Sequence, residues 1–148
     1  MRLVFTKGPG KYDRMDVYRP GEPPVSIDCP KQRIIPHDMV HDAVERILGE
    51  RGFLTRVRDG ESASFRMQAE AHSDAVERLV EVFQGDAWSG GHAPPAEMID
   101  LYRITCTERA CPMLPVDDAA ILAVRAEIER LTAEWDVVPV GGTLTLSM

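Results

Sequence analysis

The sequence predicts an α+β fold: an antiparallel sheet, formed by an N-terminal meander that a C-terminal strand joins, with about four helices packed mainly on one face. Three features of the chain favour this class. Short segments of alternating apolar residues, separated by Gly/Pro turns, fill the first 30 residues. Segments with apolar residues at helical spacing dominate the region from residue 37 to residue 136. A last alternating segment closes the chain, and the N-terminal meander is the sheet available to pair with it.

Length and composition indicate a globular protein. At 148 residues the chain suits one domain, 1–148, and its 44% hydrophobic and 28% charged residues are typical of a folded chain. The net charge of −7 argues against a general nucleic-acid partner, because phosphate contacts need a concentrated positive face. No apolar run approaches the roughly 18 residues of a membrane helix. The cysteines lack CxxC spacing and the N-terminus has no signal-peptide core, so we expect a cytoplasmic protein that does not contact membranes.

Four strands are predicted from period-two alternation. The first covers residues 2–7 and is followed by the turn sequence GPGK. The inward-facing residues of the other three are Asp13, Met15 and Val17 in the second, Val25, Ile27 and Cys29 in the third, and Leu144, Leu146 and Met148 in the C-terminal strand.

Four helices are predicted from apolar residues three and four apart. Pro36 and Gly52 bound the first, Ser73 and Gly85 the second, Pro95 starts the third, and Asp117 caps the last. Between the first two, residues 53–67 read as a hairpin closed at Asp59-Gly60, a pair that favours a type I′ turn. The predicted core draws on Val40, Val44, Ile47, Leu48, Val76, Leu79, Val80, Leu101, Ile121, Val124, Ile128 and Leu131. The pentapeptide DAVER occurs at 42–46 and at 74–78, which we interpret as coincidence because its flanks do not match.

The segment HDMVH, residues 37–41, predicts a candidate metal site. On a helix His37, His41 and Glu45 lie along one strip of the surface, where two imidazoles four residues apart can hold a zinc ion. The segment resembles the HExxH motif of zinc metallopeptidases over these five residues, with Asp38 at the position of the catalytic glutamate. Glu45 is one candidate third ligand, and donors from elsewhere are His72, His92, Asp100 and Cys29. The alternative is an ordinary amphipathic helix with two histidines at its edge.

Two further sets of residues are candidates for catalysis. Ser89 and His92 lie in a glycine-rich loop and could act as nucleophile and base, although such loops usually serve only as connectors. Cys29 precedes the histidine helix and could form a Cys/His dyad.

A basic cluster and a tryptophan are candidates for binding. Arg51, Arg56 and Arg58, with Arg33 and Arg66 as further members, could bind an anionic ligand or an acidic partner, or could pair with acids of the chain. Trp88, if exposed, would be a contact residue.

Three functions follow from these patterns. The first is a binding or regulatory module without a complete catalytic constellation, whose partner would be a protein or a small anionic ligand. The second is a zinc-dependent hydrolase or metalloprotein centred on His37 and His41. The third is an enzyme with a Cys/His or Ser/His nucleophile.

Overall fold

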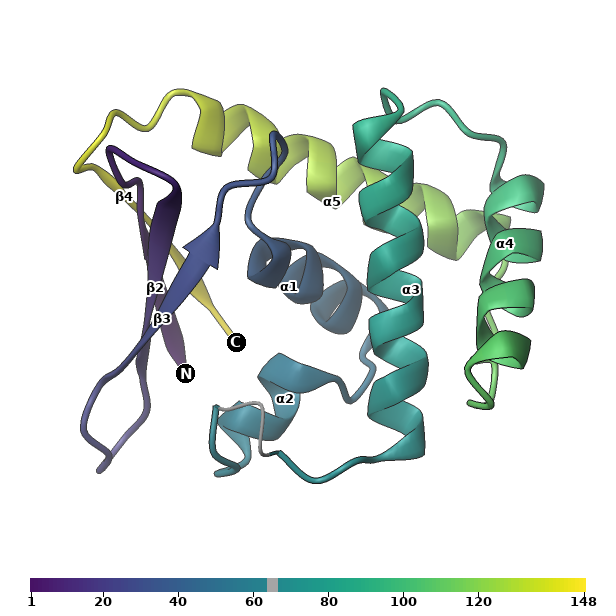
Figure 1. The fold of residues 1–148 in the computed structure, drawn as a ribbon, viewed down its shortest axis with the longest axis horizontal. Helices are drawn as coiled ribbons and strands as arrows, with labels where there is room; N and C mark the ends of the chain where they lie inside the picture. The colour runs from purple at the N-terminus through teal and green to yellow at the C-terminus, as the bar shows by residue number, and fades with distance from the viewer. Residues whose placement is uncertain (64–66) are drawn as a thin grey trace.

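The structure is a computed structural model that describes residues 1–63 and 67–148. Strands and helices follow one another as β1 (Arg2–Thr6), β2 (Tyr12–Tyr18), β3 (Val25–Pro30), α1 (His37–Leu48), α2 (Phe53–Arg58), α3 (Ala71–Trp88), α4 (Pro95–Glu108), α5 (Asp118–Asp136) and β4 (Thr143–Ser147) (Figure 1). The α+β class with an antiparallel sheet is confirmed.

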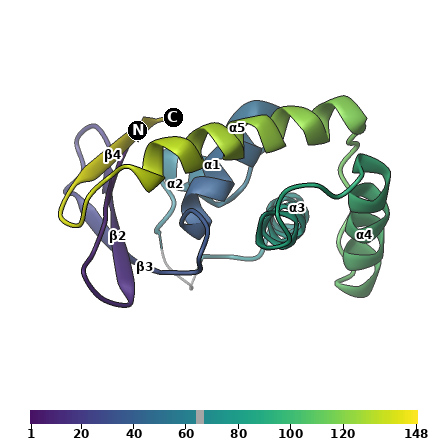
Figure 2. The same ribbon diagram turned by 90° about the horizontal axis from the view of Figure 1, so that it is seen from above.

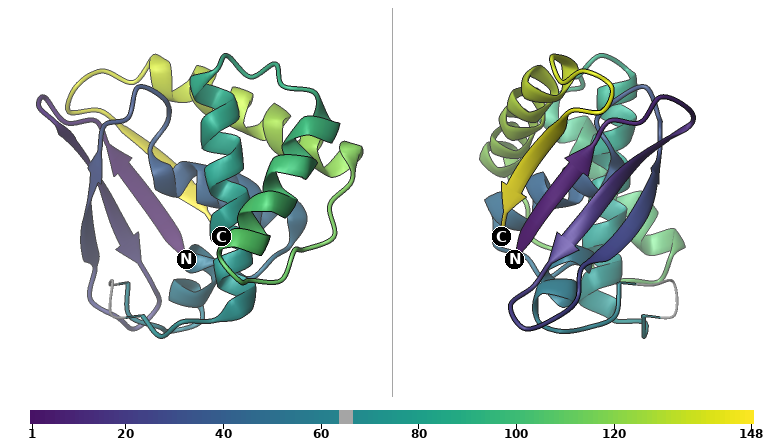
Figure 3. Two further views of the ribbon diagram at one scale, coloured as in Figure 1. Left: turned by 45° about the vertical axis from the view of Figure 1, so that its right-hand side comes forward. Right: turned by 90° about the vertical axis from the view of Figure 1, so that its left-hand side faces the viewer.

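The sheet has the strand order β3-β2-β1-β4, with every neighbouring pair antiparallel. Leu3 of β1 pairs with Val17 on one side and Leu146 of β4 on the other, so the C-terminal strand joins the meander as predicted. Alternation then points Leu3, Phe5, Met15 and Val17 toward the helices, and all four are buried. The helices lie on this one side of the sheet (Figure 3).

The helices form a layer built around α1. It lies between the sheet and α3, α5 runs across it, and α4 packs on the far side of α3 (Figures 1 and 2). The predicted stripe of α5 is fully buried, and the Asp117 carboxylate accepts a hydrogen bond from the Ala120 N–H as the expected cap. Trp135 of this helix meets Phe5 of the sheet edge-on at 6.5 Å between ring centroids.

Three predicted helix boundaries are wrong. Helix α1 ends before Gly52, because Gly49 already takes the left-handed conformation (φ 67°) that closes it. Helix α3 begins at Ala71 rather than after a Ser73 cap, and it continues past Gly85 to Trp88.

The predicted hairpin at 53–67 is also wrong over its described part. Phe53–Arg58 is the short helix α2, which buries Leu54 and Val57 three residues apart on one face. Its free N–H groups are satisfied by a carboxylate from α1, a tertiary interaction that a sequence does not display. The second predicted strand of the hairpin includes residues 64–66, which lie outside the described residues.

Nine of the twelve predicted core residues are buried, and Leu48 is partly buried against the core. Ile47 and Leu101 are corrections, with 37% and 50% of their surface exposed. Helix α4 contacts the rest of the protein through Met98, Tyr102 and Cys106, a strip with four-residue spacing. Leu101 lies about 100° around the helix from Tyr102, at the edge of this strip. Within the described ranges, no helix has the length and apolar character needed to cross a membrane.

Candidate metal centre

The two histidines of α1 lie at its buried N-terminal end. Pro36, with extended backbone angles, precedes the helix and fixes its start at His37. Four residues separate His37 from His41, so their rings lie on one side of the helix with centroids 4.8 Å apart. The His41 side chain is 2% exposed and the His37 side chain 39%, which leaves the pair open to solvent only at His37.

A third donor comes from α3. The Glu77 carboxylate lies 3.2 Å from His37 Nε2 through Oε1 and 2.6 Å from His41 Nε2 through Oε2. One donor atom from each of these three residues lies within 4.8 Å of the others. Among the described residues, this is the cluster of His, Cys, Asp or Glu side chains close enough to share one metal ion. The candidate centre therefore joins two helices, and both imidazoles present the same ring nitrogen to it.

Glu45 holds His41 from the opposite side. Its Oε2 lies 2.8 Å from His41 Nδ1, and its two oxygens also accept hydrogen bonds from the N–H groups of Gly52, Leu54 and Thr55 at 3.0, 3.1 and 2.8 Å. Both oxygens are thus occupied at the start of α2. Glu45, predicted above as a possible ligand, therefore holds the His41 ring from the side opposite Glu77.

Gly52 is required for this arrangement. A Cβ atom at residue 52 would lie 2.6 Å from Glu45 Cδ and 2.6 Å from Val76 Cγ1, closer than carbon atoms can approach. The absence of a side chain lets the backbone of α2 reach the buried carboxylate.

The electrostatics of His41 follow from its two carboxylate neighbours. Burial opposes protonation, but hydrogen bonds to Glu45 and Glu77 outweigh it and raise the pKa of His41 to about 10. Burial would likewise raise the pKa of Glu77, yet hydrogen bonds from His37 and His41 hold it well below its usual range. At neutral pH, therefore, the His41 imidazole is protonated and bridges the Glu45 and Glu77 carboxylates.

Asp38 and Cys29 lie beside the centre and face each other. Burial raises the pKa of the Asp38 carboxyl, and the neighbouring charges of His41 and His37 oppose this effect. Cys29 Sγ is 4.0 Å from Asp38 Oδ2 and donates to the Ile27 carbonyl oxygen at 3.7 Å. Burial and the nearby Asp38 raise the pKa of the Cys29 thiol to about 12, which does not favour the thiolate that a nucleophile needs.

The other candidate donors lie elsewhere. His72 pairs with Glu50 at 2.7 Å, Asp100 pairs with Arg103 at 2.7 Å, and His92 is exposed on the loop after α3. In that loop Ser89 Oγ donates to the Gly85 carbonyl oxygen at 2.9 Å. Trp88 is 54% exposed, but its Nε1 donates to the Gln32 carbonyl oxygen at 2.7 Å.

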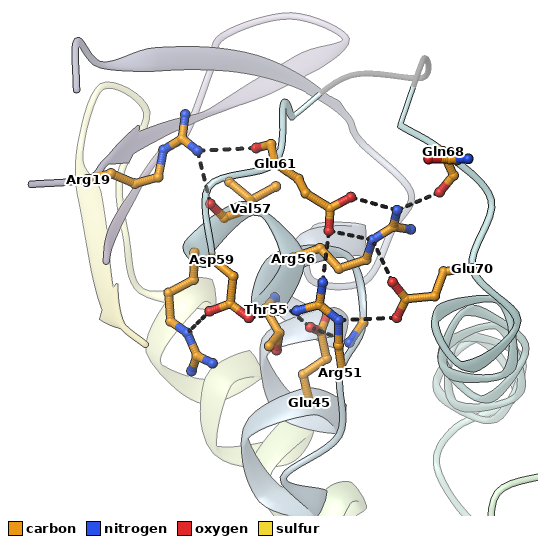
Figure 4. Close-up of polar contacts among 12 residues, drawn as sticks. Arg19, Glu45, Arg51, Thr55, Arg56, Val57, Asp59, Glu61, Gln68 and Glu70 are labelled. Carbon is orange, nitrogen blue, oxygen red and sulfur yellow. Dashed lines mark hydrogen bonds and ion pairs between the residues drawn. The ribbon is translucent and has the colours of Figure 1, made fainter.

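The arginine cluster at α2 pairs with acids of the same chain (Figure 4). Arg51 contacts Asp59, Glu61 and Glu70 within 3.2 Å, and Arg58 lies 3.2 Å from Asp59. The buried Arg56 side chain contacts Glu61 and donates to the Gln68 carbonyl oxygen at 2.5 Å. These contacts match the alternative in which the arginines pair with acids of the chain. Arg33 is exposed before α1, and Arg66 lies outside the described residues.

Glu77 is the site residue that the sequence did not identify. One signal was available: Glu45 and Glu77 occupy the same position in the two DAVER segments, and in the structure they bond to opposite nitrogens of His41. The repeat therefore marks both carboxylates of the centre, although nothing in the pattern says that α1 and α3 pack together.

Comparison with known proteins adds no assignment. No protein-family model matches the sequence, and no curated protein and no solved structure is significantly similar to it. The function must be inferred from the geometry of the site.

Proposed function

We propose that this protein binds one divalent transition-metal ion of the zinc class between His37, His41 and Glu77. The observation that carries the proposal is the convergence of three donors from two helices, all within 4.8 Å of one another. Two imidazoles and one carboxylate form a donor set that zinc uses. Donors bonded at about 2.0–2.1 Å in a tetrahedron lie about 3.3 Å apart. Glu77 faces His37 through Oε1 at 3.2 Å and His41 through Oε2 at 2.6 Å. One Glu77 oxygen and the two Nε2 atoms lie within 4.8 Å of one another, so their separations need to change by up to about 1.5 Å to reach the tetrahedral value.

The surroundings of His41 support the same proposal. A ligand histidine commonly donates its second ring N–H to a carboxylate, which fixes the tautomer and directs the other nitrogen at the metal. Glu45 does this to Nδ1, while Nε2 faces Glu77. Because backbone N–H groups anchor Glu45, the imidazole is held in place before an ion arrives.

A centre with three protein donors keeps a coordination position open for water. Zinc lowers the pKa of such a water to about 7, so hydrolysis is the reaction class that this centre would support. The 39% exposure of His37 and the 31% exposure of Glu77 give a small molecule access from one side. Asp38 stands where the HExxH motif has its catalytic glutamate, and it is the carboxyl that we propose as the base acting on this water.

Metal analysis of protein purified without a histidine tag tests the proposal. We expect about one zinc ion per chain in the unaltered protein. In His37→Gln and in Glu77→Gln the zinc content should fall below about 0.2 ions per chain, because two donors hold zinc far more weakly than three. His72→Gln and Glu81→Gln are matched controls, since these residues lie on α3 outside the centre. Cobalt uptake, followed by its visible absorption, reports the coordination directly. If the protein takes up neither ion stoichiometrically, or if the controls lose as much metal, the proposal is wrong.

A second candidate function, a binding module without metal chemistry, has one observation in its favour. Glu45 and Glu77 already satisfy both ring nitrogens of His41 when that residue carries a proton. The same variants separate the two candidates, because in a metal-free module Glu77→Gln changes stability and leaves the metal content at the background level.

A further inference from the structure

A cavity outside the histidine centre is lined by residues from the C-terminal end of α3 and from α5. Figures 1 and 2 show how these two helices cross. The cavity has a volume of about 380 Å³, within the range of small-molecule sites. Ile34, Phe83 and Ile128 supply apolar side chains to its lining. Phe83 and Ile128 are themselves buried in the core, so this part of the wall is fixed by packing.

Polar contacts hold the two sides of the cavity in place. Arg125 Nε and Nη2 donate to the two oxygens of Asp86 at 3.0 Å each, which ties α5 to α3. Arg125 Nη2 also donates to the Ala93 carbonyl oxygen at 2.6 Å. The Trp88 bond to Gln32 fastens the end of α3 to the segment before α1, from which Ile34 comes. The cavity is therefore largely formed in advance.

The charges of the lining are unbalanced. Arg125 and Asp86 neutralise each other, whereas Glu129 and Asp136 are exposed and have no ion-pair partner among the residues that the structure describes. The last turn of α3 carries no basic residue, so its negative dipole end adds to the same sign. Two basic residues lie near the cavity without lining it. Lys7 donates through Nζ to the Trp135 carbonyl oxygen at 2.6 Å, next to Asp136, and Arg33 precedes Ile34 in the chain.

We propose that this cavity binds a small organic cation, a protonated amine or guanidinium carried on an apolar body. The apolar wall removes the body of such a ligand from water, and the carboxylates of Glu129 and Asp136 attract its charge. An anion would meet two unpaired carboxylates, and a neutral analogue would gain only the apolar contact. The proposal is independent of the metal centre, because the two sites share no residue.

Benzylamine, benzyl alcohol and benzoate form a probe series that differs mainly in charge. Titrations of the intact protein, followed by amide chemical shifts, should show saturable binding of benzylamine at the cavity. Benzyl alcohol should bind at least about fivefold more weakly and benzoate not at all. Benzylamine binding should also weaken as salt rises, because the carboxylates are exposed. A lysine derivative blocked at both ends distinguishes the source of the cation: tighter binding than benzylamine assigns the cavity to a protein side chain, and weaker binding assigns it to a free amine.

Charge-neutral variants complete the test. Glu129→Gln and Asp136→Asn should each weaken benzylamine binding about twofold to fivefold, as expected for the loss of one exposed charge pair. Glu134→Gln removes the same charge from the same helix, at a residue that pairs with Arg130 outside the cavity, and should have no effect. Circular dichroism checks that each variant is folded. Equal affinity for the amine and the alcohol, or equal loss in Glu134→Gln, overturns the proposal, as does the absence of shifts around Phe83 and Ile128.

Discussion

Replacing Glu45 by glutamine tests whether this carboxylate organises the centre. The side chain is fully buried and accepts four hydrogen bonds, from His41 and from three backbone N–H groups. Glutamine has nearly the same shape but only one oxygen, so it can serve the donors on one side and turns an NH₂ group toward the others. Two donors then lose their acceptor, and the charge that faced the His41 proton is gone.

The magnitude follows from the number of orphaned donors. Each buried donor without a partner costs about 1–3 kcal/mol, so Glu45→Gln should lower the free energy of unfolding by about 4 kcal/mol. With a urea dependence of about 2 kcal/mol per molar, the unfolding midpoint of the metal-free protein should fall by about 2 M. Glu50→Gln is the matched control. It removes a carboxylate from the chain just after α1, but its pair with the partly exposed His72 should contribute less than about 1 kcal/mol.

Urea unfolding followed by far-UV circular dichroism in the presence of a chelator measures both variants. The slope of the transition should stay unchanged, so that the midpoint reports stability alone. A loss below about 1 kcal/mol in Glu45→Gln, similar to that of the control, would refute the view that Glu45 anchors His41 and α2.

Further predictions concern glycine positions, pH and metal affinity. Gly52→Ala should destabilise the protein by about 1–3 kcal/mol, because its Cβ would overlap Glu45 and Val76. Gly85→Ala, in α3 with open space around the new carbon, should instead stabilise it by about 0.5–1 kcal/mol, and thermal unfolding checks both signs. The folded-state pKa of His41, about 10, lies above its ordinary value of 6.5. The metal-free protein should therefore keep the full contribution of His41 below about pH 6.5 and lose it as the pH rises through 10. Urea midpoints between pH 6 and 10 measure this, and His41→Gln should remove that part of the pH dependence. Zinc must displace the same proton, so competition with a chelator should show apparent affinity increasing with pH over this interval.

Local patterns predicted most of the fold because each element meets its own sequence rule. Met15 and Val17 alternate into the core, and the stripe of α5 from Ile121 to Trp135 is buried as its spacing requires. The rule failed at Phe53–Arg58, where the turn preference of Asp59-Gly60 suggested a hairpin. The helix forms there because a carboxylate from α1 satisfies the first N–H groups of α2. The contact with Glu45 joins two segments that are separate in the chain, so local sequence patterns do not reveal it.

The candidate site divides in the same way. That His37 and His41 share one side of a helix follows from their spacing, and the structure places them so. Which carboxylate meets them depends on how α1 packs against α3. The glutamate on their own helix, Glu45, reaches Nδ1 of His41, and this contact leaves Nε2 for the glutamate of the neighbouring helix. Because one imidazole has two nitrogens on opposite edges of its ring, a carboxylate on the same helix and one across the interface can both bind it without competing. Glu45, which the spacing suggested as a ligand, thus leaves only Nε2 of His41 for the carboxylate from α3.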